Sequence, residues 1–145
     1  MYTIDIDRLE AQEMGGGLSV TFPFSSATGT TDTASVYMVF DPDGTLPEHT
    51  DSAEEWLLVL EGTVEATVGG ETGTLEAGRL AYVPALVPHS ARNVGDGNAR
   101  ILGFFGASTN LGVFTEELAP GVQILVVGAK PGVALPVMQL EPAAA

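Results

Sequence analysis

The two histidines of this chain lie in segments that also carry carboxylates, and together they have the composition of a metal site. His49 is followed by Asp51 and Glu55, and His89 lies in a second segment further along the chain. Residues i and i+2 of a strand project from the same face, so His49 and Asp51 point the same way and Glu55 keeps that parity. If a second strand brings His89 opposite them, two imidazoles and two carboxylates converge. Such a donor set suits Fe(II), Mn(II) or Zn(II) and disfavours Cu(I).

The first segment resembles the first signature motif of the cupin family, G-x5-H-x-H-x3/4-E-x6-G. Its slots are occupied by Gly44, His49, Asp51, Glu55 and Gly62. The spacing matches from His49 onward, whereas Gly44 lies one residue closer to the histidine than in the family pattern. Asp51 stands where the family usually has its second histidine, so a harder oxygen donor takes the place of an imidazole.

The second segment is similar to the second cupin motif, G-x5-P-x-G-x2-H-x3-N. Gly78, Pro84, His89 and Asn93 match it position for position, and Leu86 occupies the slot of the inner glycine. The two segments and the residues between them cover roughly a third of the chain. Matches at this many fixed spacings are hard to produce by chance, and the chain is identified as resembling the small single-domain cupins.

This resemblance implies an all-β fold of the cupin type, a double-stranded β-helix or jelly-roll barrel, with a metal near one end of an apolar cavity. It implies one divalent ion per chain (Fe, Mn or Zn, with Ni as a further option) bound by His49, Asp51, Glu55 and His89. Two alternatives stay open. Asp51 is a solvated rim residue, which leaves His49, Glu55 and His89 as a facial triad, or the barrel has lost its metal.

Family members include dioxygenases, isomerases, lyases and binding modules, so the fold does not fix the function. The resemblance favours a metal-dependent, dioxygenase-like enzyme that acts on a small oxygen-chelating organic molecule. The alternatives are a non-redox Lewis-acid isomerase or lyase, in which Glu55, the candidate catalytic residue, or a metal-bound water moves a proton, and a non-catalytic barrel that binds a small molecule. Whether the protein is an enzyme is left open at this point.

Composition narrows the classes of partner. The chain has 145 residues, which suits one domain, and it has no cysteine, which removes disulfides and thiolate metal sites. A formal net charge of -14 argues against nucleic acid and anionic membranes as partners, and leaves a small molecule as the expected ligand. No apolar run is long enough to cross a bilayer and no targeting signal precedes the first charged residues, so we expect a cytoplasmic protein.

We expect a single cupin domain over residues 1–145, with an N-terminal arm at 1–17, the barrel at 18–140 and a frayed tail at 141–145. The apolar run Trp56–Leu60 predicts a strand covered on both faces. Further strands are expected at Leu18–Phe24, Val36–Phe40, Thr63–Val68, Thr72–Leu75, Leu80–Val83, Arg100–Phe105, Val122–Val127 and Val133–Leu140.

Exposed strand edges and an apolar outer face favour a homodimer. Tyr2, Ile4 and Ile6 alternate with polar residues, as a strand crossing to a partner or closing onto its own barrel would. Trp56 is expected in the core or an interface, and Tyr82 in barrel packing. Aromatic and leucine side chains near the end of the chain are interpreted as caps of the barrel or as subunit contacts rather than as ligand contacts, namely Phe104, Phe105, Leu111 and Phe114.

Overall fold

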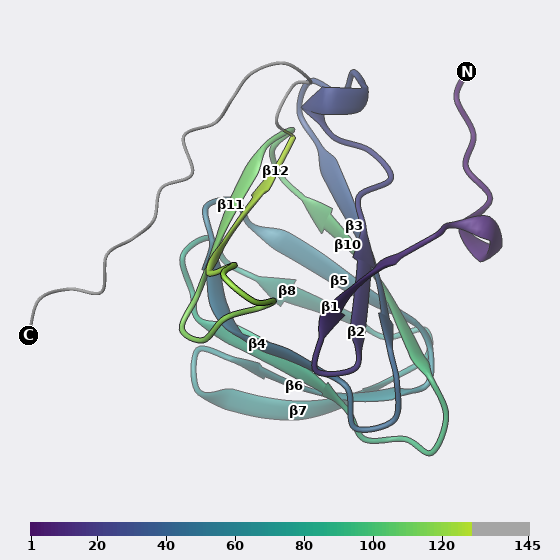
Figure 1. Ribbon diagram of the computed structural model, residues 1–145, viewed down its shortest axis with the longest axis vertical. Coiled ribbons are helices and arrows are strands. Elements are labelled where there is room, and N and C mark those ends of the chain that lie inside the picture. The colour runs from purple at the N-terminus through teal and green to yellow at the C-terminus, as the bar shows by residue number, and fades with distance from the viewer. Residues whose placement is uncertain (129–145) are drawn as a thin grey trace, which may run out of the picture.

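The computed structural model describes residues 1–128 as two antiparallel sheets packed face to face (Figure 1). One six-stranded sheet has the order β1-β2-β3-β10-β5-β8, with β1 (Gln12–Gly15), β2 (Leu18–Thr21), β3 (Ala34–Phe40), β10 (Ala99–Phe105), β5 (Glu55–Glu61) and β8 (Leu80–Val83). The other has the order β12-β11-β4-β9-β6-β7, with β12 (Ile124–Val127), β11 (Asn110–Phe114), β4 (Thr45–Asp51), β9 (His89–Asn93), β6 (Thr63–Val68) and β7 (Glu71–Glu76). The all-β jelly-roll prediction is confirmed.

Alternation along the strands places one apolar row of each sheet between the two layers. Phe40, Val59 and Ile101 from the first sheet and Val64 from the second are almost fully buried there. Burying side chains of this size contributes about 1.5–3 kcal/mol each, so the space between the sheets is the core that fixes their relative position. The predicted hairpin between β6 and β7 is also present. Its turn is Gly69-Gly70, with φ of 57° and 86°, the left-handed conformation that glycine adopts without strain.

The N-terminal arm is shorter than predicted. Gln12–Gly15 pairs with β2 across the turn Gly16-Gly17, so the sheet begins before residue 18 and the arm comprises residues 1–11. Tyr2 and Ile4 lie outside any strand and are 90% and 40% exposed, which contradicts a strand closing onto its own barrel. The arm leaves the body of the molecule in Figure 1. Its helical turn η1 (Ile6–Arg8) is tied to β10 by a 2.9 Å ion pair between Asp7 and Arg100.

Only one face of β5 is covered, so the prediction that both faces of Trp56–Leu60 are buried is wrong. Trp56 is 56% exposed and lies between Phe104 of β10 and Tyr82 of β8 in the pairing of neighbouring strands. The next row along the same outer face holds three leucines. We call this surface the outer patch, and its members are Trp56, Leu58, Leu80, Tyr82, Leu102 and Phe104. Tyr82 therefore lies outside rather than in barrel packing.

Other strands begin or end a few residues away from the predicted boundaries. The strand expected at Leu18–Phe24 ends at Thr21, and the one expected at Val122–Val127 begins at Ile124. The strand expected at Val133–Leu140 and the tail at 141–145 lie outside the described residues. Within residues 1–128, no helix has the length and apolar character needed to cross a membrane.

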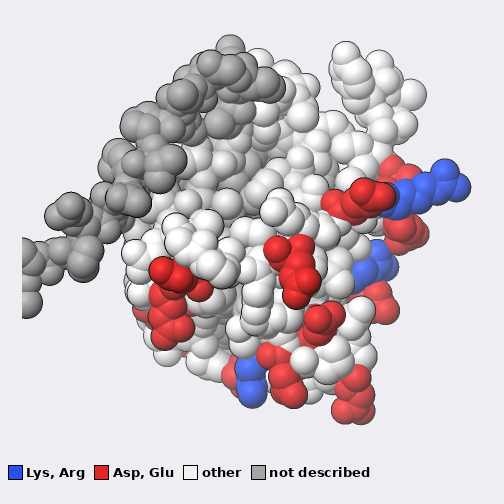
Figure 2. All heavy atoms as spheres, in the orientation of Figure 1, with Lys and Arg blue, Asp and Glu red and all other residues white. Residues whose placement is uncertain are grey.

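Acidic side chains are scattered over the face seen in Figure 2. Basic side chains lie next to carboxylates: Arg8 pairs with Asp5 at 3.3 Å, and Arg100 pairs with Glu61 at 2.6 Å as well as with Asp7. These pairs are at the surface, where each contributes about 0–1 kcal/mol, so they neutralise charge more than they stabilise the fold.

Candidate metal centre

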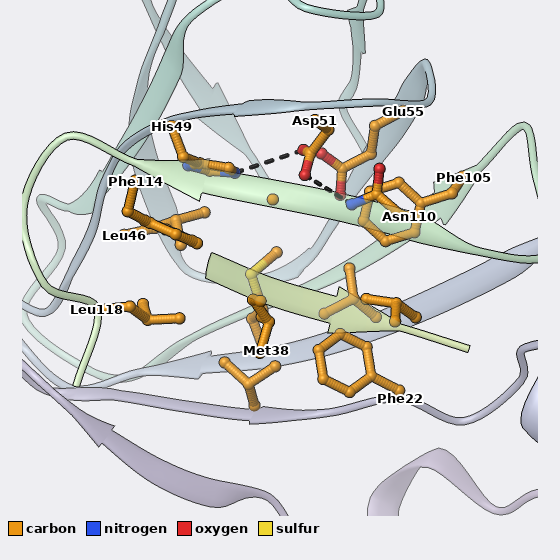
Figure 3. A pocket seen from close by; sticks show the side chains of 15 residues that line it. Phe22, Met38, Leu46, His49, Asp51, Glu55, Phe105, Asn110, Phe114 and Leu118 are labelled. Atoms are coloured by element: carbon orange, nitrogen blue, oxygen red, sulfur yellow. Dashed lines mark hydrogen bonds and ion pairs between the residues drawn. The ribbon is translucent and has the colours of Figure 1, made fainter. Parts of the chain in front are cut away.

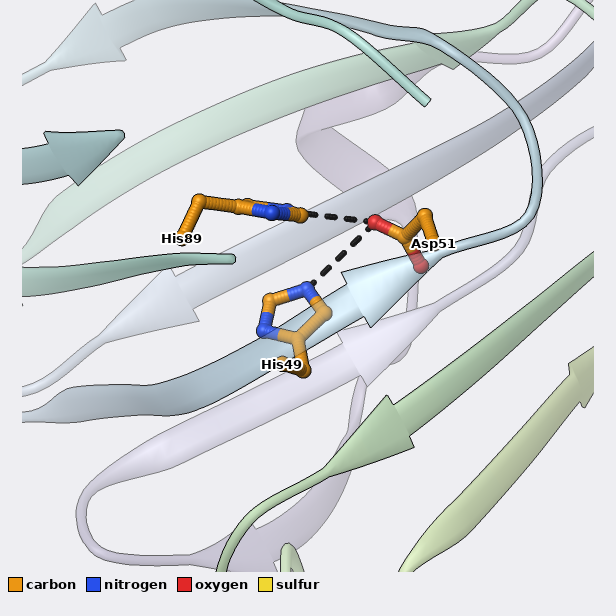
Figure 4. A group of neighbouring side chains, drawn as sticks. All are labelled: His49, Asp51 and His89. Atoms are coloured by element: carbon orange, nitrogen blue, oxygen red, sulfur yellow. Dashed lines mark ion pairs between the residues drawn. The ribbon is translucent and has the colours of Figure 1, made fainter. Parts of the chain in front are cut away.

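The pairing of β4 with β9 brings the two histidines together. The strands are antiparallel and His49 lies directly opposite His89, after a register shift between Leu46 and His49. Asp51, two residues after His49, projects from the same face, as the parity argument predicts. Figure 4 shows the two imidazoles converging on one oxygen of Asp51. His49, Asp51 and His89 are buried, with at most 5% of each residue exposed.

The donor atoms of this cluster lie at the separations found around a bound ion. Oδ2 of Asp51 is 3.1 Å from Nε2 of His89 and 3.4 Å from Nε2 of His49. The candidate ligand atoms of these residues all lie within 4.8 Å of one another. Ligands about 2.1 Å from a metal are about 3 Å apart when they occupy neighbouring positions, so only small shifts separate this arrangement from a coordinated one.

Each imidazole is held in the tautomer that a metal requires. Nδ1 of His49 lies 2.8 Å from the carbonyl oxygen of Pro47, and Nδ1 of His89 lies 2.9 Å from that of Val87. A carbonyl only accepts, so in both rings Nδ1 is the donor, and in the neutral ring the lone pair is on Nε2. Nε2 is therefore the atom that each histidine could offer to a metal.

Two buried polar atoms in the cluster have no hydrogen-bond partner within the described part of the chain. They are Oδ2 of Asp51 and Nε2 of His89, the same two atoms that face each other. Buried polar groups without a partner are rare because each costs about 1–3 kcal/mol. A divalent cation bound by both atoms would satisfy them at once, so His49, Asp51 and His89 could hold such an ion.

Glu55 reaches the cluster from the opposite sheet, at the start of β5. Its Oε2 lies 3.4 Å from Nε2 of His89, and the residue is 3% exposed. Its other oxygen lies against Gly103 of β10, where an added Cβ would sit 2.6 Å from Oε1. Glu55 is nevertheless outside the group in which all candidate ligand atoms lie within 4.8 Å of one another. The neighbouring Glu54 is exposed, as its opposite parity predicts.

Asp51 is not a solvated rim residue, since it is 4% exposed. Burial alone would raise its pKa, but the neighbouring imidazoles of His49 and His89, and after them the amide of Asn110, hold the pKa of Asp51 well below its usual range. Burial works against the charged form of His89, yet Asp51 and Glu55 raise its pKa to about 10. Burial, together with the charge of Asp51, raises the pKa of Glu55. The metal-free cluster thus holds protons that a cation would displace.

An apolar cavity opens beside the cluster, between the two sheets (Figure 3). Phe114 of β11 lies opposite His49 and stacks on its ring, with centroids 4.4 Å apart. Phe105 also lines the cavity, so the interpretation of these two phenylalanines as caps or subunit contacts is wrong. Phe104 and Leu111 are 44% and 39% exposed and lie outside it. His49, Asp51 and Glu55 line the cavity from the cluster. The remaining described lining residues are Val20, Phe22, Val36, Met38, Leu46, Asn110, Gly112, Leu118, Leu125 and Val127.

Asn110 is a site residue that the sequence did not reveal. It opens β11, is 3% exposed, and its Nδ2 donates to Oδ1 of Asp51 at 2.7 Å. β11 was not predicted because glycine interrupts the short segment Asn110–Phe114, and both Asn and Gly disfavour strands. The available sequence signal for this strand was Asn110 followed by the alternating apolar residues Leu111 and Val113.

Leu86, in the glycine slot of the second motif, adopts a backbone conformation that glycine enters without strain. Its φ is 64°, in the left-handed region that side chains with a Cβ rarely enter. Its backbone N–H donates to the carbonyl oxygen of Asp51 at 2.8 Å, so the turn before β9 is joined to the end of β4. The side chain itself is 69% exposed.

Comparison with known proteins identifies relatives of this arrangement. The family model described as "Cupin domain" (Cupin_2) matches residues 36–105. Polyketide synthase CurC of Streptomyces cyaneus is 30% identical over 100 residues, which cover 68% of this chain and 65% of that protein. The match therefore spans less than two thirds of the relative's length.

Two solved structures have the same fold at low identity. The polyketide cyclase RemF of Streptomyces resistomycificus superposes with a TM-score of 0.63 at 20% identity, covering 72% of this chain and 78% of RemF. Oxalate decarboxylase of Bacillus subtilis superposes with a TM-score of 0.69 at 23% identity, covering 76% of this chain and 30% of that protein. With both motifs on neighbouring strands of a jelly-roll barrel, and with the family model matching across them, this chain belongs to the cupin superfamily.

Proposed function

We propose that this protein is a metal-dependent enzyme that binds a small, mostly apolar molecule through two neighbouring oxygens and promotes a proton transfer on it. One observation carries the proposal. The ionisable groups that line the cavity are His49, Asp51 and Glu55, which lie together beside His89, and the rest of the described lining is hydrocarbon apart from Asn110. The polar atoms of a ligand can therefore be bound only at this end of the described cavity.

This distribution favours a substrate with its oxygens at one end. Neither lysine nor arginine occurs among the described residues that line the cavity. A dianion such as oxalate, with a carboxylate at each end, would place one charge against hydrocarbon, which is costly. A small 1,3-diketone carries two chelating oxygens and an apolar remainder, and polyketide chains are built from such 1,3-dicarbonyl units. The names of CurC and RemF, a polyketide synthase and a polyketide cyclase, agree with that class.

The residues of the cluster divide into two roles in this proposal. His49, Asp51 and His89 hold the ion, which when bound supplies Lewis-acid polarisation of the substrate oxygens. Glu55 lies beside His89 without belonging to the tight group of donors, and its pKa is raised by burial. A carboxyl group with a raised pKa exchanges protons more readily near neutral pH, so Glu55 takes a proton from the substrate carbon and returns it elsewhere. The apolar walls exclude water from this exchange.

A dioxygenase acting on the same class of molecule is the second candidate. Two imidazoles and a carboxylate are the donors that non-haem Fe(II) oxygenases use, and His49, His89 and Asp51 supply that set. The apolar cavity suits this chemistry equally well. The two candidates differ in whether the reaction consumes dioxygen, and that difference can be measured directly.

The test is to load the metal-free protein separately with Fe(II), Mn(II), Ni(II) and Zn(II) and to offer 1,3-diketones, flavonols and catechols with and without oxygen. With Zn(II) under argon, we expect proton exchange at the carbon between the two carbonyls of a diketone. The exchange is measured as deuterium incorporation in NMR spectra. Turnover confined to a redox metal with oxygen would support the dioxygenase. Tight ligand binding without any product would leave a binding module.

Two variants separate the role of Glu55 from a general loss of structure. Glu55→Gln keeps the shape of the side chain and removes its proton transfer, so exchange should fall by about 100-fold or more while metal content is retained. Glu54→Gln changes the exposed neighbour and should leave the exchange rate and the metal content unchanged. Equal exchange rates in wild type and Glu55→Gln would contradict the role given to Glu55.

A further inference from the structure

Asn110 occupies one oxygen of Asp51 and leaves the other for the ion. Its Nδ2 donates to Oδ1 of Asp51 at 2.7 Å, whereas Oδ2 of the same carboxylate faces His49 and His89 and has no hydrogen-bond partner within residues 1–128. The two oxygens of one carboxylate therefore have different surroundings. Both residues are buried, so water does not even out that difference.

The amide of Asn110 is itself fixed in one orientation. Its Oδ1 accepts from the backbone N–H of Ala53 at 3.1 Å and from the hydroxyl of Ser52 at 3.3 Å. A flipped amide would aim its N–H groups at those donors and its oxygen at the carboxylate of Asp51. The turn between β4 and β5 thus sets the direction in which Nδ2 points.

Gly112 leaves room for the same carboxylate on another side. It lies opposite Asp51 in the pairing of β11 with β4, and an added Cβ would sit 3.2 Å from Oδ1. Rotation of the carboxylate would move Oδ1 away from a charge-assisted hydrogen bond, which is worth about 1.5–3 kcal/mol. Oδ2 is then the oxygen held towards the two imidazoles.

We propose that Asn110 is a positioning residue that makes Asp51 a one-oxygen metal ligand through Oδ2. The proposal rests on the metal site of the proposed function and goes beyond it, because it assigns the orientation and denticity of one ligand to a residue on a different strand. It also explains how an aspartate, shorter than the histidine usual in this slot, presents a donor at a defined place. Residues that orient ligands in this way typically change metal affinity by about 10–100-fold.

A double-mutant cycle tests the proposal. Zn(II) and Mn(II) affinities are measured by competition with a chromophoric chelator for wild type, Asn110→Ala, Asp51→Ala and the double variant. We expect Asn110→Ala to weaken binding by about tenfold or more, and to have no further effect once Asp51 is absent. A purely structural role for Asn110 would lower affinity by the same factor in both backgrounds, and that result would overturn the proposal.

Two further variants keep the test decisive. Leu111→Gln changes the exposed side chain next to Asn110 and leaves the hydrogen bonds of the Asn110 amide in place, so its affinity should stay within about twofold of wild type. Asn110→Leu has nearly the shape of asparagine and serves if the alanine variant unfolds; unchanged affinity in this variant would also overturn the proposal. Visible absorption of the Co(II)-loaded proteins reports a change in coordination number. Absence of metal binding in wild type would instead refute the proposed function.

Discussion

The two faces of β5 show how differently one strand can use neighbouring residues. Glu55, Leu57 and Val59 point inward and are at most 4% exposed, while Trp56 between them points outward and is 56% exposed. The carboxylate, the most polar of these side chains, is buried, and the tryptophan, among the least polar, is at the surface. Glu55 is tolerated inside because His89 lies within 3.4 Å of it.

The two faces of β5 therefore place different requirements on their side chains. The inner face depends on the positions of a few donor atoms, so a single substitution there should abolish a property. The outer patch depends on apolar area, which many residues share, so substitutions there should act gradually and leave the inner site intact. The predictions that follow challenge this separation.

Removing an imidazole should have the largest effect. His49→Ala and His89→Ala should each lower the affinity for Zn(II) or Mn(II) by more than about 100-fold, because each removes a donor atom from the cluster and not only a residue that orients one. Elemental analysis of untagged protein measures this directly. Trp56→Gln, on the opposite face of β5, is the control and should retain wild-type metal content. Stoichiometric metal in both histidine variants would break the assignment of the site.

Metal affinity should rise with pH. The pKa of His89 is raised to about 10 in the metal-free protein, so below that pH a bound proton must leave before the ion enters. Displacement of one proton gives an increase of about tenfold per pH unit between roughly pH 7 and 9. Titration calorimetry in buffers of different ionisation enthalpy measures the released protons. An affinity that is flat over this range would contradict the raised pKa.

The same shift acts on the stability of the metal-free protein with the opposite sign. A raised pKa in the folded state means that protonated His89 stabilises the fold fully below its ordinary value of 6.5. That contribution is lost as the pH rises through about 10. High pH therefore favours the metal-bound form while it weakens the metal-free fold, and urea unfolding at two pH values separates the two trends.

The outer patch should hold together a homodimer. Trp56, Phe104 and Tyr82 form an exposed row across three strands, and the arm adds exposed Tyr2 and Ile4, which are not paired with any strand of the barrel. Because each chain carries a formal charge of -14, association should strengthen as salt screens the repulsion.

Light scattering of the wild type should give twice the mass of one chain, and Trp56→Gln combined with Phe104→Thr should give a single chain with unchanged metal content. Leu111→Gln changes an exposed leucine of the other sheet and should leave the mass unchanged. A single-chain mass for the wild type at micromolar concentration would refute the dimer.

The smallest effect is expected at Leu86, in the turn that joins the two parts of the site. Its φ of 64° strains a side chain that is 69% exposed and contributes little burial. Leu86→Gly should raise the free energy of unfolding by up to about 1 kcal/mol, since relief of left-handed strain exceeds the added freedom of the unfolded chain. Leu80→Gly, in a strand without positive φ, should destabilise by a similar amount. Urea unfolding compares the two, and a loss of stability in Leu86→Gly would contradict this account.

The sequence predicted the site where local periodicity was enough. His49 and Asp51 share a face because they are two residues apart, and the second motif placed His89 on a strand of its own. Their convergence needed only that β4 and β9 pair in register. Asn110 and Phe114 could not be predicted in the same way, because their roles depend on β11 pairing with β4 across more than fifty residues of chain.

The fold was predictable in class and less so in its surfaces. An apolar run such as Trp56–Leu60 is compatible with a strand covered on both faces or on one, since periodicity disappears when the outer residues are apolar too. The start of the sheet was misplaced because the arm was expected to run to residue 17, although Gly15 already pairs with Leu18 and Gly16-Gly17 form the turn between β1 and β2.

The backbone carbonyls of Pro47 and Val87 orient the two imidazoles before any ion arrives. A site assembled in this way does not select its metal by folding around it, since the ligands are already in place. Among divalent first-row ions, intrinsic affinity for such donors follows a common order whatever the protein. Under the proposed function, the ion that occupies the protein in a cell would be set by the supply of free metals there, and the activity of the same polypeptide would depend on the conditions under which it is made.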